Sequence, residues 1–177
     1  DALLIGEVWE DASNKTAYGQ RRRYFTNGEL DSVMNYPLRE AILEFATGKS
    51  TAADFVRLVK HQAEVYPPAF RYSLMNLIGS HDRPRALNML VFRGCMDMPK
   101  ADQQWVRLSA DEYNLAVKRY KMCIDLLCAL PGCPTVYYGD EAGCEGGKDP
   151  FNRRTYPWGK EDPELLAHFH QLGQLRK

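Results

Sequence analysis

Carboxylate side chains stand directly after three short apolar runs of this 177-residue chain, namely at Glu7, at Asp82 and at the pair Asp140 and Glu141. Cleavage of a glycosidic bond needs two carboxyl groups, one protonated as a general acid and one ionised. Aromatic side chains that would suit sugar rings lie near these carboxylates in the sequence: Trp9, Tyr36, Tyr137 and Tyr138. These residue types are compatible with a glycosidase, but by themselves they do not select one.

The elements that must position these carboxylates alternate along the chain. Short apolar runs predict buried strands at 3–6, 30–36, 73–78 and 134–138. Apolar residues at helical spacing predict the longer helices at 38–45, 51–65, 109–129 and 163–176, with a shorter one within 83–94. The segments 11–29, 95–109 and 139–160 are expected to be loops. Such alternation predicts a parallel sheet covered by helices.

The handedness of βα units determines where the carboxylates come to lie. Right-handed crossovers place the C-terminal end of every strand on one face of the sheet. The polar clusters that follow the strands should therefore gather on that face, where barrel enzymes keep their active sites. Ser109 and Glu112 have the spacing of a capping box and mark the start of the helix 109–129.

The composition is that of an ordinary globular domain. Hydrophobic residues make up 45% and charged residues 26% of the chain, which argues against a disordered or collagen-like protein. No apolar run reaches the ~18 residues that a membrane span needs. The 23 basic and 23 acidic residues balance, so nothing points to nucleic acid or an anionic membrane as a partner. No linker or repeat is visible, and we expect residues 1–177 to form one domain without a second.

The five cysteines are scattered and lack CxxC spacing, and the four histidines form no ligand cluster with them. This pattern favours free thiols over a disulfide framework and therefore a reducing, cytoplasmic setting. We expect no metal site and no cofactor.

Four segments resemble motifs of the α-amylase family of glycoside hydrolases (family 13), with wording most similar to its neopullulanase and cyclomaltodextrinase branch. Residues 4–9, 76–85 and 130–141 resemble the motifs of that family's fifth, seventh and eighth barrel strands, and 146–154 resembles the loop that follows. The motifs occur in the family's order and span nearly the whole chain. The resemblance implies the second half of a (β/α)8 TIM barrel, strands five to eight with their helices.

The resemblance also implies roles for individual residues. Glu7 matches the general acid/base, which protonates the leaving oxygen and later deprotonates water. Asp82 matches a second carboxylate, which holds sugar hydroxyls and stabilises the oxocarbenium-like transition state. The residues that match substrate contacts are His81 at the cleavage subsite, Trp9 beside the acid/base, and Asp149 with Arg153 on the non-reducing side.

The chain departs from the family pattern in one respect that bears on activity. The family's nucleophile is an Asp in a Gly-Phe-Arg-x-Asp-like motif, and the 177 residues contain neither this motif nor the family's third-strand Asn-His motif. Both would precede Asp1, and the family's C-terminal β-sandwich would follow Lys177. We therefore expect a fragment of a retaining hydrolase that cleaves α-1,4 or α-1,6 bonds in α-glucans or maltooligosaccharides, and we expect the isolated chain to be inactive.

Other interpretations of the same residues remain open. The chain could belong to an α-glucanotransferase, or it could be a non-catalytic sugar-binding module. Asp149 and Arg153 could form a loop ion pair, while Asp140 and Glu141 favour a structural role and the basic run 21–23 a solvated face. Unpaired edges of a half barrel would be covered or paired, which predicts a homodimer of two half barrels.

Overall fold

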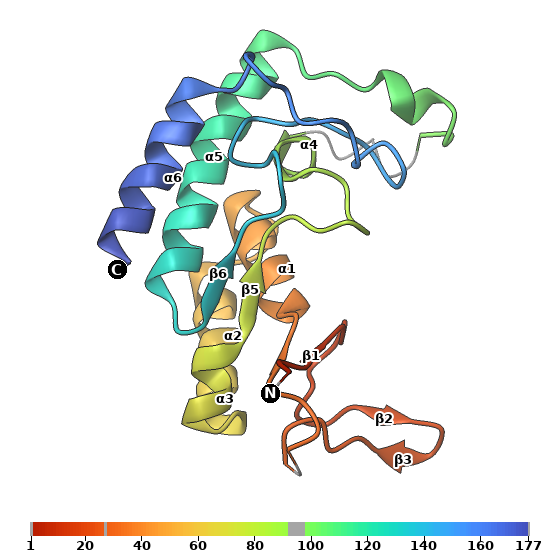
Figure 1. Ribbon diagram of the computed structural model, residues 1–177, viewed down its shortest axis with the longest axis vertical. Coiled ribbons are helices and arrows are strands. Elements are labelled where there is room, and N and C mark those ends of the chain that lie inside the picture. Colours follow the sequence, from red (N-terminus) through yellow and green to blue (C-terminus); the bar gives the residue numbers. More distant parts are fainter. Residues whose placement is uncertain (1, 27, 92–97, 177) are drawn as a thin grey trace. The chain divides into compact units, whose positions relative to one another are not determined.

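The computed structural model describes residues 2–26, 28–91 and 98–176 (Figure 1). The chain forms two compact units that alternate along the sequence. The first unit consists of residues 1–77 and 129–135, and the second unit of residues 78–128 and 136–177. The first unit holds the main strands, and the second holds the loops that follow the last two of them.

Four parallel strands run through the first unit: β1 (Ile5–Gly6), β4 (Ser32–Val33), β5 (Met75–Leu77) and β6 (Cys133–Thr135). β1 pairs with β4, and β5 pairs with β6. A parallel bridge between Met34 and Met75 joins the two pairs, so the order across the ladder is β1, β4, β5, β6. The predicted parallel pairing of these strands is confirmed, and the structure adds that they follow the order of the chain.

The strands are shorter and less buried than the apolar runs predict. Leu3, Leu4 and Ile5 are 70%, 51% and 46% exposed, so the prediction of a buried first strand is wrong. The physical reason is position, because β1 lies at the outer end of the ladder and pairs only with β4 in the described part of the chain. The last run also ends early, and residues 136–138 lie beyond β6.

The helices of the first unit are α1 (Tyr36–Ala46), α2 (Ala52–Val65) and α3 (Pro68–Ser73). α2 begins at the predicted place with a capping box, in which Thr51 and Asp54 bond each other's backbone N–H groups. Ile42, on α1, is fully buried. The sequence pattern does not predict the helix α3, which follows α2 closely and begins at Pro68. A proline at the first helical position also starts a helix readily.

A small hairpin occupies part of the segment 11–29, which was expected to be a loop. β2 (Thr16–Ala17) pairs antiparallel with β3 (Gln20–Arg21). Tyr18 and Gly19 connect them with φ values of 53° and 72°, the left-handed backbone of a tight two-residue hairpin turn. The prediction failed because strands this short show no alternation of apolar and polar residues.

The second unit contains α4 (Ala86–Val91), the 3-10 helix η2 (Asp102–Trp105), most of α5 (Ala110–Ala129) and α6 (Pro163–Leu175). The capping box at the start of α5 is confirmed, since Ser109 and Glu112 bond as predicted. α5 and α6 lie side by side in Figure 1, with the rings of Tyr120 and Phe169 6.0 Å apart. The predicted loop 95–109 contains η2, and residues 92–97 fall outside the described residues.

The described cysteines support the prediction of free thiols. Cys123, Cys128, Cys133 and Cys144 are free, and Cys95 lies outside the described residues. Among the described helices, none combines the length and the apolar character required to cross a membrane.

Candidate active site

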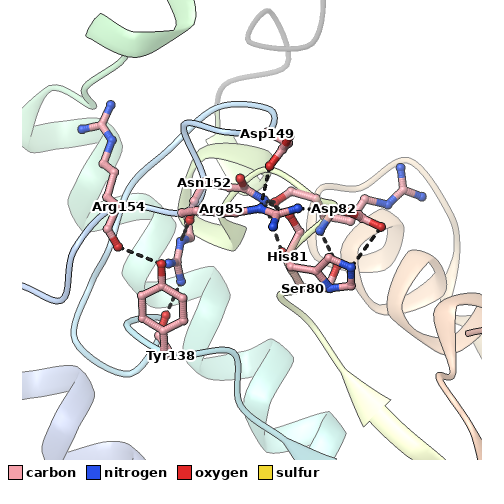
Figure 2. A network of polar contacts seen from close by, with 10 residues as sticks. Ser80, His81, Asp82, Arg85, Tyr138, Asp149, Asn152 and Arg154 are labelled. Carbon is pink, nitrogen blue, oxygen red and sulfur yellow. Dashed lines mark hydrogen bonds and ion pairs between the residues drawn. The ribbon is translucent and has the colours of Figure 1, made fainter. Parts of the chain in front are cut away.

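Four of the residues singled out in the sequence meet in the second unit, on two loops, and Figure 2 labels three of them, His81, Asp82 and Asp149. His81 Nε2 lies 3.2 Å from Asp82 Oδ2, and Arg153 Nη2 lies 3.4 Å from Asp82 Oδ1. Arg153 Nε lies 2.5 Å from Asp149 Oδ1. These contacts join the four side chains into one continuous polar row, which we call the site row.

The site row is open to solvent. Its side chains are between 37% and 49% exposed, so a ligand can reach them. The row presents carboxylate acceptors beside guanidinium and imidazole donors, which is the set of groups that can bind a ligand carrying many hydroxyls. Because exposed ion pairs of this kind contribute little to stability, we attribute no folding role to them.

A buried asparagine lies beneath the site row. Asn152 is fully buried, and its Nδ2 donates to the backbone oxygens of His81 at 2.5 Å, Arg83 at 2.9 Å and Ser80 at 3.4 Å. The Asn152 side chain thus contacts the backbone of His81 itself and of the residues on either side of the pair His81 and Asp82. Figure 2 shows Asn152, which belongs to the loop of Asp149 and Arg153, beside the segment that carries His81 and Asp82.

A buried arginine holds this asparagine from the other side. Arg85 Nε donates to the backbone oxygen of Asn152 at 2.7 Å, and Arg85 Nη1 donates to Asp140 Oδ1 at 2.9 Å and to the oxygen of Tyr138 at 2.5 Å. The side chains of Arg85 and Asp140 are 0% and 2% exposed. The guanidinium lies 4.4 Å and 4.7 Å from the ring centres of Tyr137 and Tyr138. Asp140 is therefore the counter-ion of a buried arginine, which supports its structural interpretation.

Burial shifts the pKa values of several groups in the second unit, two of them in the surroundings of this arginine. Burial raises the pKa of the Cys144 thiol, and the positive charge of Arg85 partly offsets the rise. Burial and the neighbouring Tyr138 raise the pKa of Tyr137. Glu145 also has a pKa raised by burial, against the lowering effect of the Leu108 N–H, which donates to its carboxylate.

Glu7 and Trp9, the remaining predicted site residues, belong to the first unit. Glu7 follows β1 directly and is exposed. The Trp9 ring stacks on Tyr36 with centroids 4.3 Å apart and planes 3° apart, and Tyr36 is 1% exposed. Trp9 itself is 39% exposed, so a buried tyrosine at the start of α1 holds a partly open aromatic surface in place.

A second buried asparagine, Asn76, accounts for a glycine in another of the motif segments. Asn76, on β5, accepts a hydrogen bond from Asn35 Nδ2 at 2.9 Å and donates to the oxygen of Pro131 at 2.9 Å. Gly132 has φ 125°, and a Cβ there would lie 2.4 Å from Asn76 Nδ2. Glycine is thus required where the turn before β6 passes this amide.

Neither Arg85 nor Asn152 stands out in the sequence as a functional residue, although both lie inside segments that resemble family motifs. Arginine and asparagine are mostly exposed residue types, so burial is not the expectation for either. A signal was nevertheless present, because Asp140 directly follows an apolar run and would need a cationic partner if buried.

The family profile described as "Alpha amylase, catalytic domain" matches residues 1–171.

The chain belongs to the α-amylase family. An amylopullulanase of Thermoanaerobacter thermohydrosulfuricus is 37% identical over 187 residues, covering 99% of this chain and 12% of that protein. A cyclomaltodextrinase of Geobacillus thermopakistaniensis is 32% identical over 180 residues, covering 100% of this chain and 25% of that protein. A solved cyclomaltodextrinase structure matches with a TM-score of 0.74 and 27% identity, covering 98% of this chain and 25% of that one.

This α-amylase family chain thus spans a quarter or less of the length of these relatives. Its relatives are glycoside hydrolases with TIM-barrel catalytic domains, and its own structure is a partial α/β fold of that type.

Proposed function

We propose that this chain is part of a retaining α-glucan hydrolase that cleaves α-1,4 or α-1,6 glucosidic bonds. The observation that carries the proposal is the solvent-open site row of His81, Asp82, Arg153 and Asp149, in a chain that belongs to the α-amylase family. Relatives named amylopullulanase and cyclomaltodextrinase support α-glucans as the substrate class.

The proposed place of the chain is the second half of one catalytic barrel domain, strands five to eight. The support is the ladder β1, β4, β5, β6, which is parallel and follows the order of the chain. The small share that the chain covers of each relative agrees with a part of a larger enzyme.

In the proposed mechanism Glu7 and Asp82 have different tasks. Glu7 donates a proton to the leaving glycosidic oxygen and later removes a proton from the attacking water. Asp82 holds sugar hydroxyls and stabilises the positive charge that develops on the ring in the transition state. A retaining reaction also needs a carboxylate nucleophile, and the family's nucleophile motif does not occur in the 177 residues.

Four residues would orient the sugar. His81 is next to Asp82 and can donate to a hydroxyl at the cleavage subsite. Arg153 and Asp149 extend the same row and would bind a neighbouring sugar ring on the non-reducing side. Trp9 offers an aromatic face for sugar stacking.

The test is to assay the 177-residue chain on maltooligosaccharides, cyclodextrins and pullulan, and to titrate it with maltotriose by calorimetry. We expect no turnover and weak binding that Asp82→Asn abolishes, while Lys49→Ala, an exposed change in the first unit, leaves binding unchanged. Turnover lost in Glu7→Gln would overturn the proposed inactivity. Absence of binding would contradict the assignment of the substrate contacts.

Two alternatives are separated by further measurements. A transferase would use the same residues but pass the sugar to a second sugar instead of water, so product analysis of an enzyme that includes the nucleophile distinguishes it. A non-catalytic sugar-binding module would leave that longer enzyme inactive while the 177-residue chain still binds maltotriose.

We further propose that the isolated 177-residue chain self-associates through its strand edges. β1 and β6 each pair on one side in the described part of the chain, and Leu3, Leu4 and Ile5 expose apolar surface beside one of these edges. Unpaired edges readily pair with other strands. Sedimentation should show a dimer, and a compact monomer at high concentration would contradict the proposal.

The free cysteines support a reducing compartment, and we propose the cytoplasm. Cys123 and Cys144 are buried thiols, while Cys133 is exposed. Exposed thiols persist where glutathione keeps them reduced. Thiol alkylation in intact cells should label Cys133 without prior reduction, and its recovery only as a disulfide would contradict this location.

A further inference from the structure

We propose that Asn152 and Arg85 are positioning residues that lock the loop of His81 and Asp82 to the loop of Asp149 and Arg153, and that this lock sets the affinity for sugar. The proposal deepens the function proposed above and rests on it for the ligand. Neither Asn152 nor Arg85 would touch the sugar, since both side chains are fully buried.

The first half of the lock fixes the backbone of the first loop. The Asn152 amide donates to the carbonyl of His81 and to those of Ser80 and Arg83, which precede and follow the two site residues. A movement of this loop away from Asn152 would leave the buried Nδ2 group and carbonyls that are buried or partly buried without these partners. Such a movement is strongly disfavoured.

The second half of the lock fixes both ends of the other loop. The Arg85 backbone N–H donates to the oxygen of Gly146 at 3.0 Å, and its side chain donates to the oxygen of Asn152 at 2.7 Å. Residues 146 and 152 flank Asp149, so one arginine holds the loop on both sides of it. Asn88 Oδ1 accepts from the Gly146 N–H at 2.7 Å and reinforces the same end.

The guanidinium is held in turn by groups that follow β6 in the sequence. Asp140 and the oxygen of Tyr138 accept from Arg85 Nη1, and both tyrosine rings lie against the guanidinium. The planar fork of arginine makes these contacts at once, and a lysine could supply only a point charge. Arg85 therefore has a defined orientation from which it can hold Asn152.

The buried lock and not the exposed row determines the spacing within the site. The contacts among Asp82, Arg153 and Asp149 are exposed, and ion pairs of that kind are too weak to hold two loops together. The hydrogen bonds of Asn152 and Arg85 are buried or partly buried and therefore harder to break. The distance from His81 to Arg153 should thus depend on residues that contact no ligand.

The test compares Asn152→Ala with a matched control, Asn35→Ala. Asn35 is also buried, at 3% exposure, and its side chain bonds Gln62 and Asn76 within the first unit. Both variants lose a buried amide, so unfolding curves should show comparable losses of stability. Maltotriose affinity should fall at least about tenfold in Asn152→Ala, because a small misplacement of binding groups is costly. It should change less than about twofold in Asn35→Ala, which lies outside the site.

A readout independent of sugar comes from NMR of the imidazole rings, since the chain has four histidines. In Asn152→Ala the signals of His81 should broaden or split into several conformations, and those of His168 on α6 should stay sharp. Because Asn152→Ala could fail to fold, Arg85→Lys serves as a second variant. It keeps the charge near Asp140 and should give the same pattern in milder form.

The outcomes separate this inference from the proposed function. Unchanged His81 signals and affinity in folded Asn152→Ala and Arg85→Lys would overturn the positioning role. Equal losses of affinity in Asn152→Ala and Asn35→Ala would also overturn it, because a general loss of stability would then suffice. If the unaltered chain binds no maltotriose but the His81 signals respond as expected, the lock stands and the proposed sugar contacts fail.

Discussion

The two units of this chain keep their elements in place by different kinds of contact. In the first unit the backbone ladder β1, β4, β5, β6 and the apolar residues of α1 provide the order. In the second unit the loops that follow β5 and β6 have no ladder, and buried side chains bond their backbone instead. The site loops thus depend on a few polar residues, whereas the strands depend on many apolar ones.

The largest loss of stability is expected when a substitution breaks the polar lock of the second unit. Arg85→Ala leaves the buried carboxylate of Asp140 without its cation, which typically costs about 3–5 kcal/mol. Urea denaturation should show this loss. Arg57→Ala, at a side chain that is 75% exposed on α2, should change stability by less than about 0.5 kcal/mol. Equal, small losses in both variants would mean that the buried pair does not hold the second unit.

The next effect addresses the apolar core of the first unit. Ile42→Ala, at a fully buried position of α1, should cost about 2–5 kcal/mol, because it leaves a cavity. Amide hydrogen exchange should rise in α1 and α2 more than around His81. Uniform loss of protection in both units would show that they unfold together, and the contrast between them would then concern geometry and not stability.

A smaller effect is expected for the capping boxes, because each unit contains one at the start of a helix. Thr51→Ala in the first unit and Ser109→Ala in the second each remove a capping-box hydroxyl, and each should cost about 1 kcal/mol in thermal or urea unfolding. The two losses should be similar, because a cap acts within one helical turn. Lys49→Ala, an exposed change beside the first cap, should have almost no effect.

The smallest effect is the pH dependence of one of these caps, that of Thr51 and Asp54. Hydrogen bonds from Thr51 lower the pKa of Asp54 to about 2. Because the folded-state pKa lies below the unfolded value near 3.8, the contribution of Asp54 is complete above about pH 4 and is lost as the pH falls through about 2. The difference in unfolding midpoint between the unaltered chain and Asp54→Asn should shrink over that window. A difference that stays constant down to pH 2 would contradict this assignment.

Local sequence patterns determined much of the fold. The capping boxes at Thr51 and Ser109 mark helix starts that the structure confirms, because a cap involves residues only three positions apart. The parallel order of the strands follows from the alternation of strands and helices. Apolar residues at helical spacing predict a buried face for α5, and Ala116, Val117, Tyr120, Ile124 and Leu127 are buried, whereas Leu130, which follows the helix, is only partly buried. The hairpin β2–β3 and the helix α3 were missed, because elements so short produce too few periodic residues.

The family motifs in the sequence singled out the residues proposed to contact sugar, but tertiary structure alone decided what supports them. Arg85 meets Asp140 across 55 positions and Asn152 across 67. Periodicity reports how a residue sits on its own element, and it carries no information about a partner so far away. Whether an arginine is solvated or buried against a distant carboxylate depends on the space that folding leaves for it. The sequence therefore indicated the site row, and only the folded chain showed the buried lock beneath it.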